Sequence, residues 1–468
     1  MFGPILHFPN PKTEAALSQP FQKALENLQT NTVPSDPGRY NHSGLMQANR
    51  FLRAGGGYAQ PWTRDASINS WNAASLLAPD LARDTLWSVT VMSDQGPIVQ
   101  PDNQWWDKVI WIVGAWNHYQ TTGDTVFLKT AYGVSARLLQ EMRRSHYSAK
   151  DDLFQGPSFF NDGIAGYPSP PAEADDQGSS FVLDHAGSNR VIALSTNCLY
   201  VGAYRAAAAM AKTLQEPAKP WDEAADKLRK AIDRRFWLPD KGLYGYLIDP
   251  NGKLDPSEEG SGLAFSILFD IASPARAKEI LKKTHIEPFG ITDVYPHFPR
   301  FSDEHPGRHN AIVWPMVEGM WARAAAKMRD AAAFAHETEN LARLTAMSGG
   351  GFFEIYNAKT GKVDGGWQNG HQWGSEHDQT WSATAYLSMI FNGLFGLRPS
   401  AEGLKFEPLV PQGWEGASLS GLPYRGATLD VQLKGFGSKV QSLLLDGKKV
   451  RQLPGTLTGH HSVIVTVR

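Results

Sequence analysis

Residues 349–386 read GGGFFEIYNAKTGKVDGGWQNGHQWGSEHDQTWSATAY, a glycine-rich loop that runs into a helix-like segment. Glu354 lies between two apolar residues, and Trp367 and Trp373 follow among glycines and amides. Indole faces stack on sugar rings, amides hydrogen-bond hydroxyls, and an apolar setting raises the pKa of a carboxyl group towards the range of a general acid or base. The stretch therefore predicts a sugar-binding loop with a catalytic carboxylate. The alternative is an irregular loop with a solvated Glu354.

Composition limits the classes of function. The chain has 468 residues, enough for one large domain and a small one, and its formal net charge is 45 − 47 = −2. No long basic block occurs, so nucleic-acid and membrane-surface binding have no electrostatic support. The 15 tryptophans either fill a large core or suit carbohydrate binding.

Cysteine usage and hydropathy leave the cellular location open. Cys198 is the only cysteine, so no disulfide within the chain is possible and the redox compartment cannot be read. No apolar run approaches the roughly 20 residues of a membrane span, and the N-terminus shows no signal-peptide pattern. We expect a soluble protein, cytoplasmic or exported after removal of a signal peptide.

The apolar periodicity predicts a mainly helical chain with a β region at its end. Residues 20–396 show eleven or twelve helices joined by alternately short and long loops, which favours an (α/α)6 six-hairpin toroid with its long loops at one end. Residues 1–19 are rich in proline and are predicted to form an irregular leader. Residues 397–468 alternate apolar and polar positions between turns, with a Leu-Leu-Leu-Asp-Gly hairpin signal at 443–447, and predict a small all-β domain.

Several common catalytic motifs are missing from the sequence. It contains no HExxH, no paired cysteines and no EF-hand pattern, so we expect neither a metal nor a cofactor. His371, His377 and the pair at 460–461 are more typical of solvated or hydrogen-bonding histidines than of ligands. A GxSxG elbow, a P-loop and a dinucleotide-binding GxGxxG are also lacking.

A second carboxylate stands in an aromatic loop. Asp162 belongs to the segment PSFFNDGIAG, far from Glu354 along the chain. Two such groups on long loops at one end of a toroid would suit glycoside hydrolysis, in which one carboxylic acid protonates the leaving oxygen while the other group activates water or attacks the sugar. The alternative for Asp162 is an ordinary Asn-Asp-Gly turn.

The order of several segments resembles the trehalase and processing α-glucosidase families (glycoside hydrolase families 37 and 63), which are inverting (α/α)6-barrel enzymes. The segments, in chain order, are VQPDNQWWDKVIWIVGAWNHYQTTGD, FQGPSFFNDG, the Asn-x-Leu-Tyr at 197–200, GRHNAIVWPMVEGM, GGFFEIYNAKTGKVDGG and WSATAYLSMI. The resemblance covers about residues 58–396. The segment LFGLRPSAEGLKFEPLVPQGW resembles the β domain that follows related barrels, including rhamnosidases and disaccharide phosphorylases.

This resemblance implies roles for particular residues. Asp162 would be the general acid and Glu354 the general base. The loop of Asp162 departs from the usual Glu-Ser-Gly-x-Asp pattern, because Gln-Gly-Pro stands at 155–157. The residues expected to bind sugar are Trp62, Arg64, Asp65 and Gln100 at the closed end of the pocket, together with Trp106, Asn161, Asn197, Trp314, Trp367 and Trp373.

The expected activity is that of an inverting exo-glycosidase that removes a terminal α-linked sugar, with α-glucose as the first choice. Its two carboxyl groups should then lie roughly 6.5–9.5 Å apart, against roughly 5–5.5 Å in a retaining enzyme. A rhamnosidase or arabinosidase on the same barrel, an (α/α)-barrel polysaccharide lyase and a non-catalytic glycan-binding protein remain alternatives. The expected partner is an oligosaccharide or glycoside substrate, and the sequence does not indicate an oligomeric state.

Overall fold

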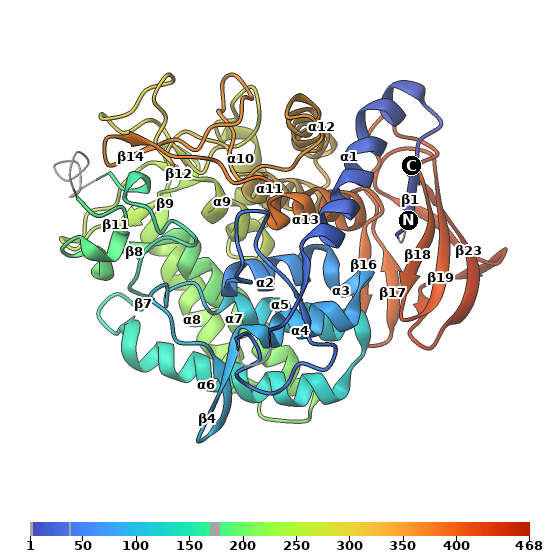
Figure 1. Cartoon of the computed structure of the whole chain (residues 1–468), viewed down its shortest axis with the longest axis horizontal. Helices are drawn as coiled ribbons and strands as arrows, with labels where there is room; N and C mark the ends of the chain where they lie inside the picture. Colours follow the sequence, from blue (N-terminus) through green and yellow to red (C-terminus); the bar gives the residue numbers. More distant parts are fainter. Residues whose placement is uncertain (1–2, 37–38, 169–177) are drawn as a thin grey trace.

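The computed structural model describes residues 3–36, 39–168 and 178–468, and within them a closed ring of helices forms the larger part of the molecule (Figure 1). Each of six inner helices contacts the next, and the last contacts the first, in the part of the chain described. In order around the ring they are α2 (Thr63–Asn69), α5 (Ile110–Thr122), α7 (Leu194–Thr213), α9 (Gly260–Leu268), α11 (Pro315–Lys327) and α13 (Thr380–Ser388). This arrangement confirms the predicted (α/α)6 toroid.

Outer helices pack around the ring and alternate with the inner helices along the sequence. They are α1 (Pro11–Thr30), α4 (Pro79–Ser88), α6 (Thr125–His146), α8 (Lys219–Phe236), α10 (Pro274–Lys283) and α12 (Ala331–Met347). They are amphipathic: α8 buries Ala225, Leu228 and Ile232 on one face and leaves a charged face in solvent. Inner helices are buried nearly all round, and every residue of α13 is buried. Short segments extend two inner helices: η1 (Ser70–Ala74) and α3 (Ser75–Leu77) follow α2, and η6 (Met389–Leu394) follows α13.

Small residues let the inner helices approach closely. A Cβ atom built on Gly319 of α11 would lie 2.7 Å from the Cβ of Ala385 on α13, and one on Gly114 of α5 would lie 2.9 Å from the carbonyl oxygen of Ser67 on α2. Both distances are well inside van der Waals contact, so glycine at these positions sets the helix spacing.

Gly319→Ala is therefore expected to destabilise the fold by about 1–3 kcal/mol, because the added methyl overpacks the contact with α13. The matched control is Gly133→Ala on the outer helix α6, where the new Cβ would meet only the end of the Arg137 side chain at 3.5 Å. That control should be neutral or stabilising by up to about 1 kcal/mol, since alanine is the better helix former. Chemical denaturation of both variants measures the difference. Equal effects would contradict this view of the ring.

Short hairpins and turns join the helices. The paired strands are β2 (Thr32–Pro34) with β3 (Arg50–Leu52), β4 (Thr90–Ser93) with β5 (Gly96–Val99), β6 (Tyr147–Ser148) with β7 (Leu153–Phe154), β8 (Ile192–Ala193) with β11 (Leu247–Ile248), β9 (Trp237–Leu238) with β10 (Leu243–Tyr244), β12 (Glu258–Glu259) with β13 (Val294–Tyr295), and β14 (Trp367–Gln368) with β15 (His371–Gln372). The turn-rich segment after α8 thus forms a hairpin.

The C-terminal residues form two sheets beside the helical ring (Figure 1). The larger has the order β1-β18-β19-β23-β20-β21, and the smaller has the order β16-β17-β22. Their strands are β1 (Ile5–His7), β16 (Leu397–Ser400), β17 (Gly403–Phe406), β18 (Ser418–Tyr424), β19 (Gly426–Lys434), β20 (Val440–Leu445), β21 (Lys448–Val450), β22 (Leu453–Pro454) and β23 (Thr458–Val467). One apolar core joins α1, α13 and both sheets. A C-terminal β region is thereby confirmed, while the domain boundary after residue 396 stays a prediction.

The predicted irregular leader is wrong for its described part. β1 pairs with β18 at the edge of the large sheet, and α1 begins at Pro11 rather than at residue 20. The Asn10 side chain caps α1 by accepting a hydrogen bond from the backbone N–H of Lys12, and Pro11 occupies the first helical turn, where its missing N–H costs nothing. Residues 1 and 2 lie outside the described part. Among the described helices, none has the length and apolar character needed to cross a membrane.

Candidate active site

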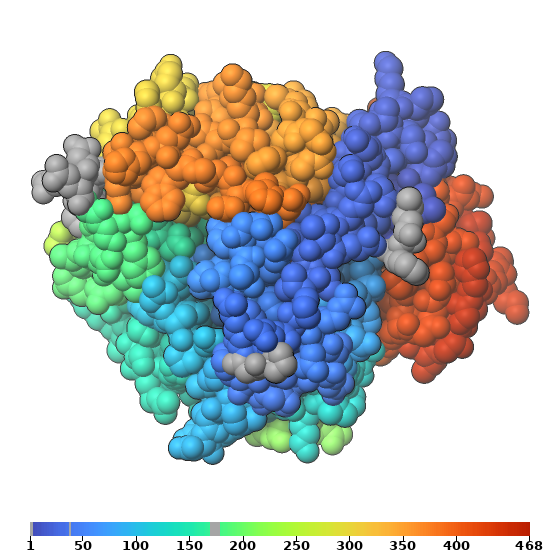
Figure 2. Space-filling view, in the orientation of Figure 1, coloured from blue at the N-terminus to red at the C-terminus, as the bar shows by residue number. Residues whose placement is uncertain are grey.

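A cavity of about 130 Å3 lies at the N-terminal ends of the inner helices α2, α11 and α13. It is smaller than the roughly 300–1,000 Å3 of pockets for drug-sized ligands, which suits a single sugar ring. The residues that line it are Ala54, Tyr58, Trp62, Arg64, Asp65, Gln104, Phe160, Asp162, Arg308, Trp314, Glu354, Gln379 and Trp381. They come from distant segments: in the space-filling view the orange segment that carries Glu354 lies against the blue N-terminal segment (Figure 2).

The backbone is strained at two aromatic residues of the cavity wall. Trp62, just before α2, has φ of 44°, and Phe160, two residues before Asp162, has φ of 43°. Bulky residues rarely adopt this left-handed conformation, and such strain concentrates at functional sites. Trp62 is 42% exposed and so stands at the open rim of the cavity, not at its closed end as expected.

Two donors hold Glu354 at the cavity wall. The Tyr58 hydroxyl donates to its Oε1 at 3.1 Å, and Arg308 Nη2 donates to its Oε2 at 2.8 Å. Arg308 is itself fixed, since its Nη1 donates to the carbonyl oxygens of Gly365 at 3.0 Å and Gly374 at 2.9 Å. The Glu354 side chain is only 5% exposed. A buried carboxylate with both oxygens engaged has one fixed orientation, as a general base requires.

Tyr58→Phe should lower kcat by about tenfold, because Glu354 loses one of the two hydrogen bonds that fix it and a hydrogen bond to a charged group contributes about 1.5–3 kcal/mol. Steady-state kinetics on the best substrate measures the effect. Tyr40→Phe is the control, since Tyr40 packs on Phe51 away from the cavity. Full activity in Tyr58→Phe would show that Arg308 alone positions Glu354.

Asp162 lies in a more strongly charged part of the cavity. Gln104 Nε2 donates to its Oδ2 at 2.9 Å, and Arg64 Nη2 lies 3.4 Å from the same oxygen. His309 Nε2 lies 3.5 Å from its Oδ1. Burial raises the pKa of Asp162, but His309 and the positive charge of Arg64 outweigh burial and hold that pKa below its usual value. Asp162 is therefore ionised in the empty cavity and must gain a proton before it can act as an acid.

Asp65 is a third carboxyl group of the cavity. It lies in the first turn of α2, is 2% exposed, and its Oδ1 has no hydrogen-bond partner in the described part of the chain. Burial raises the pKa of Asp65 well above its usual value, and the charge of Arg64 offsets this only in part. In its protonated form, a carboxyl group that lines a cavity is suited to donate a hydrogen bond to a sugar hydroxyl.

Comparison with protein families decides the class of this site. The family description "Mannosylglycerate hydrolase MGH1-like glycoside hydrolase domain" matches residues 58–382, more than half of the chain. The chain belongs to this glycoside hydrolase family. In this MGH1-like glycoside hydrolase, residues 397–451 also match "Glycosyl hydrolase family 65, C-terminal domain". The resemblance to (α/α)-barrel glycosidases is thereby confirmed.

Solved structures share the fold of this glycoside hydrolase at low sequence identity. A sialidase matches 97% of the chain with a TM-score of 0.70 and 15% identity, and the chain spans 41% of that protein. The GH63 mannosylglycerate hydrolase from Thermus thermophilus, solved with glucose, matches 79% of the chain and 99% of its own length, with a TM-score of 0.59 and 16% identity. The GH78 family rhamnosidase of Bacillus sp. GL1 matches 100% of the chain and 44% of its own length, with a TM-score of 0.59 and 13% identity. No curated protein matched the chain.

The structure brings six of the residues singled out in the sequence into one cavity: Trp62, Arg64, Asp65, Asp162, Trp314 and Glu354. Three others are buried outside it. Trp106 is fully buried and its Nε1 donates to the carbonyl oxygen of Ser158 at 2.9 Å. Asn197 is fully buried and exchanges hydrogen bonds with the backbone of Phe154, and Asn161 donates to the Tyr246 hydroxyl. These contacts support the loop of Asp162, and they correct the assignment of Trp106, Asn197 and Asn161 to substrate binding.

Gln100, Trp367 and Trp373 also lie outside the cavity lining. Gln100 is exposed directly after β5. Trp367 belongs to β14 and packs edge-on against the ring of His305. Trp373 is 40% exposed and faces the Arg308 guanidinium at 5.4 Å, so it supports the group that holds Glu354.

Sequence reasoning missed several lining residues. Tyr58 and Gln104 stand in loops with no local signal, and Gln379 directly precedes α13. Arg308 belongs to the segment GRHNAIVWPMVEGM, whose sequence does not indicate a role for this arginine. Its position shortly after a Glu-His-Pro segment carries no pattern, and only the folded chain shows that its guanidinium meets Glu354.

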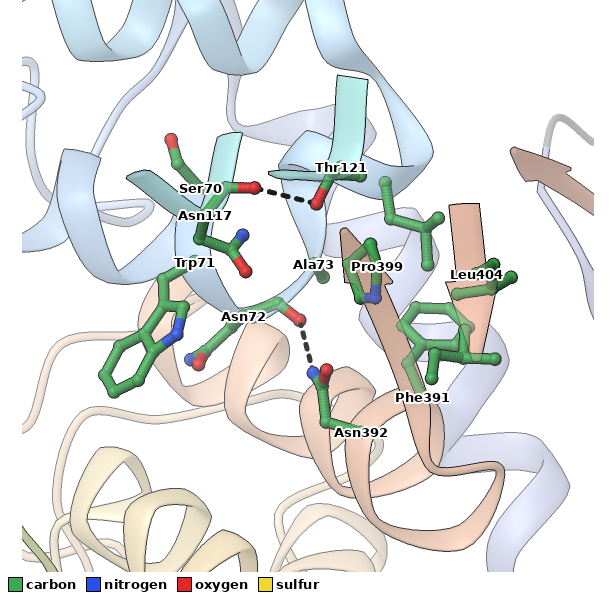
Figure 3. Close-up of a pocket in the computed structure, with 12 residues that line it drawn as sticks. Ser70, Trp71, Asn72, Ala73, Asn117, Thr121, Phe391, Asn392, Pro399 and Leu404 are labelled. Carbon is green, nitrogen blue, oxygen red and sulfur yellow. Dashed lines mark hydrogen bonds between the residues drawn. The ribbon is translucent and has the colours of Figure 1, made fainter. Parts of the chain in front are cut away.

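At the opposite end of the ring, a cavity of about 440 Å3 is lined by residues that include Trp71, Asn117, Arg323 and Asn392. A second cavity there, of about 20 Å3, has room for roughly one water. Figure 3 shows it between the ends of inner helices and the strands β16 and β17, with Asn392 donating to the backbone oxygen of Asn72. Pro399 and Leu404 of these strands line it. Neither of these two cavities shares a lining residue with the cavity of Asp162 and Glu354. No group of three or more potential metal ligands occurs in the described residues.

Proposed function

We propose that this protein is an inverting exo-glycosidase that removes one terminal α-linked sugar, with an α-glucoside as the first candidate substrate. The observation that carries the proposal is that Asp162 and Glu354 line the same sugar-sized cavity, in different electrostatic surroundings. Carboxyl groups with such different surroundings commonly divide the acid and base roles. The small volume of the cavity, about 130 Å3, supports release of a single terminal unit.

In the proposed reaction the terminal sugar fills the cavity and the rest of the substrate leaves past Trp62 at the rim. Asp162 in its protonated form gives a proton to the glycosidic oxygen as the bond to the anomeric carbon breaks. Glu354 takes a proton from a water molecule, whose oxygen bonds to the opposite face of that carbon. Asp65 and Gln379 hold sugar hydroxyls, and the rings of Trp314 and Trp381 supply apolar faces.

The surroundings of the cavity argue against a lyase. A lyase acting on a uronic acid needs a cation for the substrate carboxylate, but Arg308 is paired with Glu354 and Arg64 with Asp107 at 2.9 Å. Burial raises the pKa of Tyr58, and the Glu354 charge raises it further, so this tyrosine is a poor base. Formation of unsaturated products that absorb in the ultraviolet would contradict the proposal.

A second candidate keeps the mechanism and changes the sugar. The GH78 family rhamnosidase matches the whole chain, including the β region, and the family description names mannosylglycerate hydrolase. An α-L-rhamnoside, an α-mannoside or mannosylglycerate could therefore replace the α-glucoside; an arabinoside belongs in the same panel.

Proton NMR of the first product separates these possibilities. The purified protein is incubated with a panel of α-glucosides, α-mannosides, mannosylglycerate, α-L-rhamnosides and α-L-arabinosides, and spectra are recorded before mutarotation. Release of one monosaccharide whose anomeric configuration is opposite to that of the substrate is expected. Release of the same anomer would reject inversion. Binding without any product from any member of the panel would favour a glycan-binding protein.

A further inference from the structure

Behind Asp162 lies a buried chain of three ionisable side chains. His309 Nε2 is 3.5 Å from Asp162 Oδ1, and His309 Nδ1 is 3.5 Å from Asp293 Oδ2. The His309 side chain is 1% exposed and that of Asp293 is completely buried, whereas Asp162 is 32% exposed and faces the cavity. Of these three side chains, only Asp162 lines the cavity.

The side chains of His309 and Asp293 have few other partners. Neither ring nitrogen of His309 and neither carboxylate oxygen of Asp293 has a conventional hydrogen bond within the described residues. Buried polar groups are nearly always paired, so His309 and Asp293 stand out, and the two carboxylates are the groups that lie beside the His309 ring for charge compensation. A histidine between two carboxylates is stabilised as the imidazolium, and burial alone would have the opposite effect.

Neighbouring residues of the polypeptide hold the imidazole ring of His309 in place. The ring stacks on Trp314 with a centroid distance of 4.8 Å, and Phe160 packs against it at 5.6 Å. Gly163 and Gly166 leave room for it: a Cβ atom at these positions would lie 2.7 Å from His309 Cδ2 and 3.0 Å from His309 Cβ, respectively. The loop that carries Asp162 is therefore shaped around His309.

We propose that His309, backed by Asp293, is a positioning residue that stores the proton delivered by Asp162. This inference rests on the proposed function, in which Asp162 is the acid. In the empty cavity Asp162 is a carboxylate and His309 an imidazolium. During the reaction the proton leaves His309 Nε2 for Asp162, and the Asp162 carboxyl group gives a proton to the glycosidic oxygen. His309 is then neutral, and a proton from solvent restores it through Asp162 once the product has left.

The charged groups around Asp162, His309 and Asp293 agree with the proposed role of His309. Burial lowers the pKa of His309, but Asp162 and Asp293 outweigh burial and raise it above its usual value, which favours the imidazolium form. Burial raises the pKa of Asp293. In the described part of the polypeptide, further charged or titratable groups interact with these side chains: Arg64, Arg308 and Asp107 with Asp162, and Glu259, Tyr167 and Tyr246 with Asp293.

The test compares pH profiles of kcat/KM for His309→Gln and Asp293→Asn with the unmodified protein. In His309→Gln the alkaline limb should move to lower pH by about one unit or more, which is a loss of about tenfold at a fixed alkaline pH, because the proton held on His309 is lost and Arg64 still disfavours protonation of Asp162 directly from solvent. Asp293→Asn should move it in the same direction by less. Substrates with a good leaving group, which need no proton, should be spared in both variants. His297→Gln is the matched control, since His297 pairs with Asp303 at 2.8 Å outside the cavity lining and should leave the profile unchanged.

Two results would overturn the proposal. One is a uniform loss of activity at all pH values in His309→Gln with an unmoved alkaline limb, as a purely structural role would produce. The other is an equal loss with good leaving groups. Asp162→Asn is measured in parallel: if it shows no dependence on the leaving group, the assignment of the acid has failed, which is a separate outcome.

If His309→Gln and Asp293→Asn do not fold, NMR titration of the imidazole nitrogens decides the question in the unmodified protein. The His309 ring should stay protonated above about pH 6.5, the usual histidine value. In Asp162→Asn its titration should move to lower pH, because one of the two carboxylates is lost. A ring that titrates below that value in both proteins would contradict a stored proton.

Discussion

Glu354→Gln is expected to lower kcat by about 10²- to 10⁴-fold while KM changes little. Glutamine keeps the shape of the side chain and can still accept a hydrogen bond from Tyr58 or Arg308, but it cannot take a proton from water. General-base catalysis contributes roughly 10²- to 10⁴-fold, which corresponds to about 3–5 kcal/mol of activation free energy. Steady-state kinetics with a saturating substrate measures the effect. The control is Glu304→Gln, because Glu304 is exposed and accepts a hydrogen bond from Ser302.

A Glu354→Gln variant with near-normal kcat would reject Glu354 as the base. An increase of KM alone would instead show that Glu354 only binds the sugar, because loss of uniform binding leaves kcat unchanged. A purely structural effect would appear as a lower unfolding temperature, which the same preparation reveals.

Asp162→Asn should have an effect that depends on the leaving group. With an alkyl or sugar leaving group, which must be protonated, kcat/KM should fall by about 10²- to 10⁴-fold. With a nitrophenyl-type leaving group of low pKa the fall should be less than about tenfold. Kinetics on a series of glycosides with different leaving groups gives the dependence, and Asp152→Asn, which removes a surface ion pair with Lys227, is the control.

Equal losses across that series would contradict an acid role for Asp162. In that case Asp65 would be the next candidate, because it lies in the same cavity and its pKa is raised by burial. Asp65→Asn in the same series distinguishes a proton donor from a residue that binds a hydroxyl group.

The helical ring could be predicted because its cause is local. Apolar residues at helical spacing, interrupted by Pro, Gly and Asp breaks, mark helices such as α10, which begins at Pro274 after the Ser273 cap and ends at Lys283. Closure could not be derived in this way, because it depends on contacts such as Gly319 against Ala385, between helices far apart in the chain.

The N-terminal error has a physical explanation. The irregular leader is predicted to end before Pro20, but Pro20 lies inside α1, and Asn10 and Pro11 form the start of that helix. An Asn-Pro pair before an apolar repeat is a helix-start signal, and it was available in the sequence. The pairing of β1 with β18 was not, since the two strands are more than 400 residues apart.

Some residues of the candidate site could be predicted from the sequence, and others could not. Asp162 and Glu354 stand out as carboxylates in aromatic loops, and the cavity unites them. Trp106 and Asn197 looked equally suitable from residue type alone, but both are fully buried in support of the backbone. His309 had no distinguishing pattern, since its role depends on carboxylates from two other loops. Residue type therefore indicates candidates, and only burial and partners separate binding groups from structural ones.

The most direct test is a crystal structure of Glu354→Gln with an unreacted substrate. The terminal sugar is expected in the cavity between Arg64 and Arg308, with its glycosidic oxygen within hydrogen-bond distance of Asp162. A single water molecule should lie between Gln at position 354 and the opposite face of the anomeric carbon, with the two side chains roughly 6.5–9.5 Å apart. A sugar bound elsewhere, or one with Asp162 and residue 354 on the same face of its ring, would contradict the mechanism.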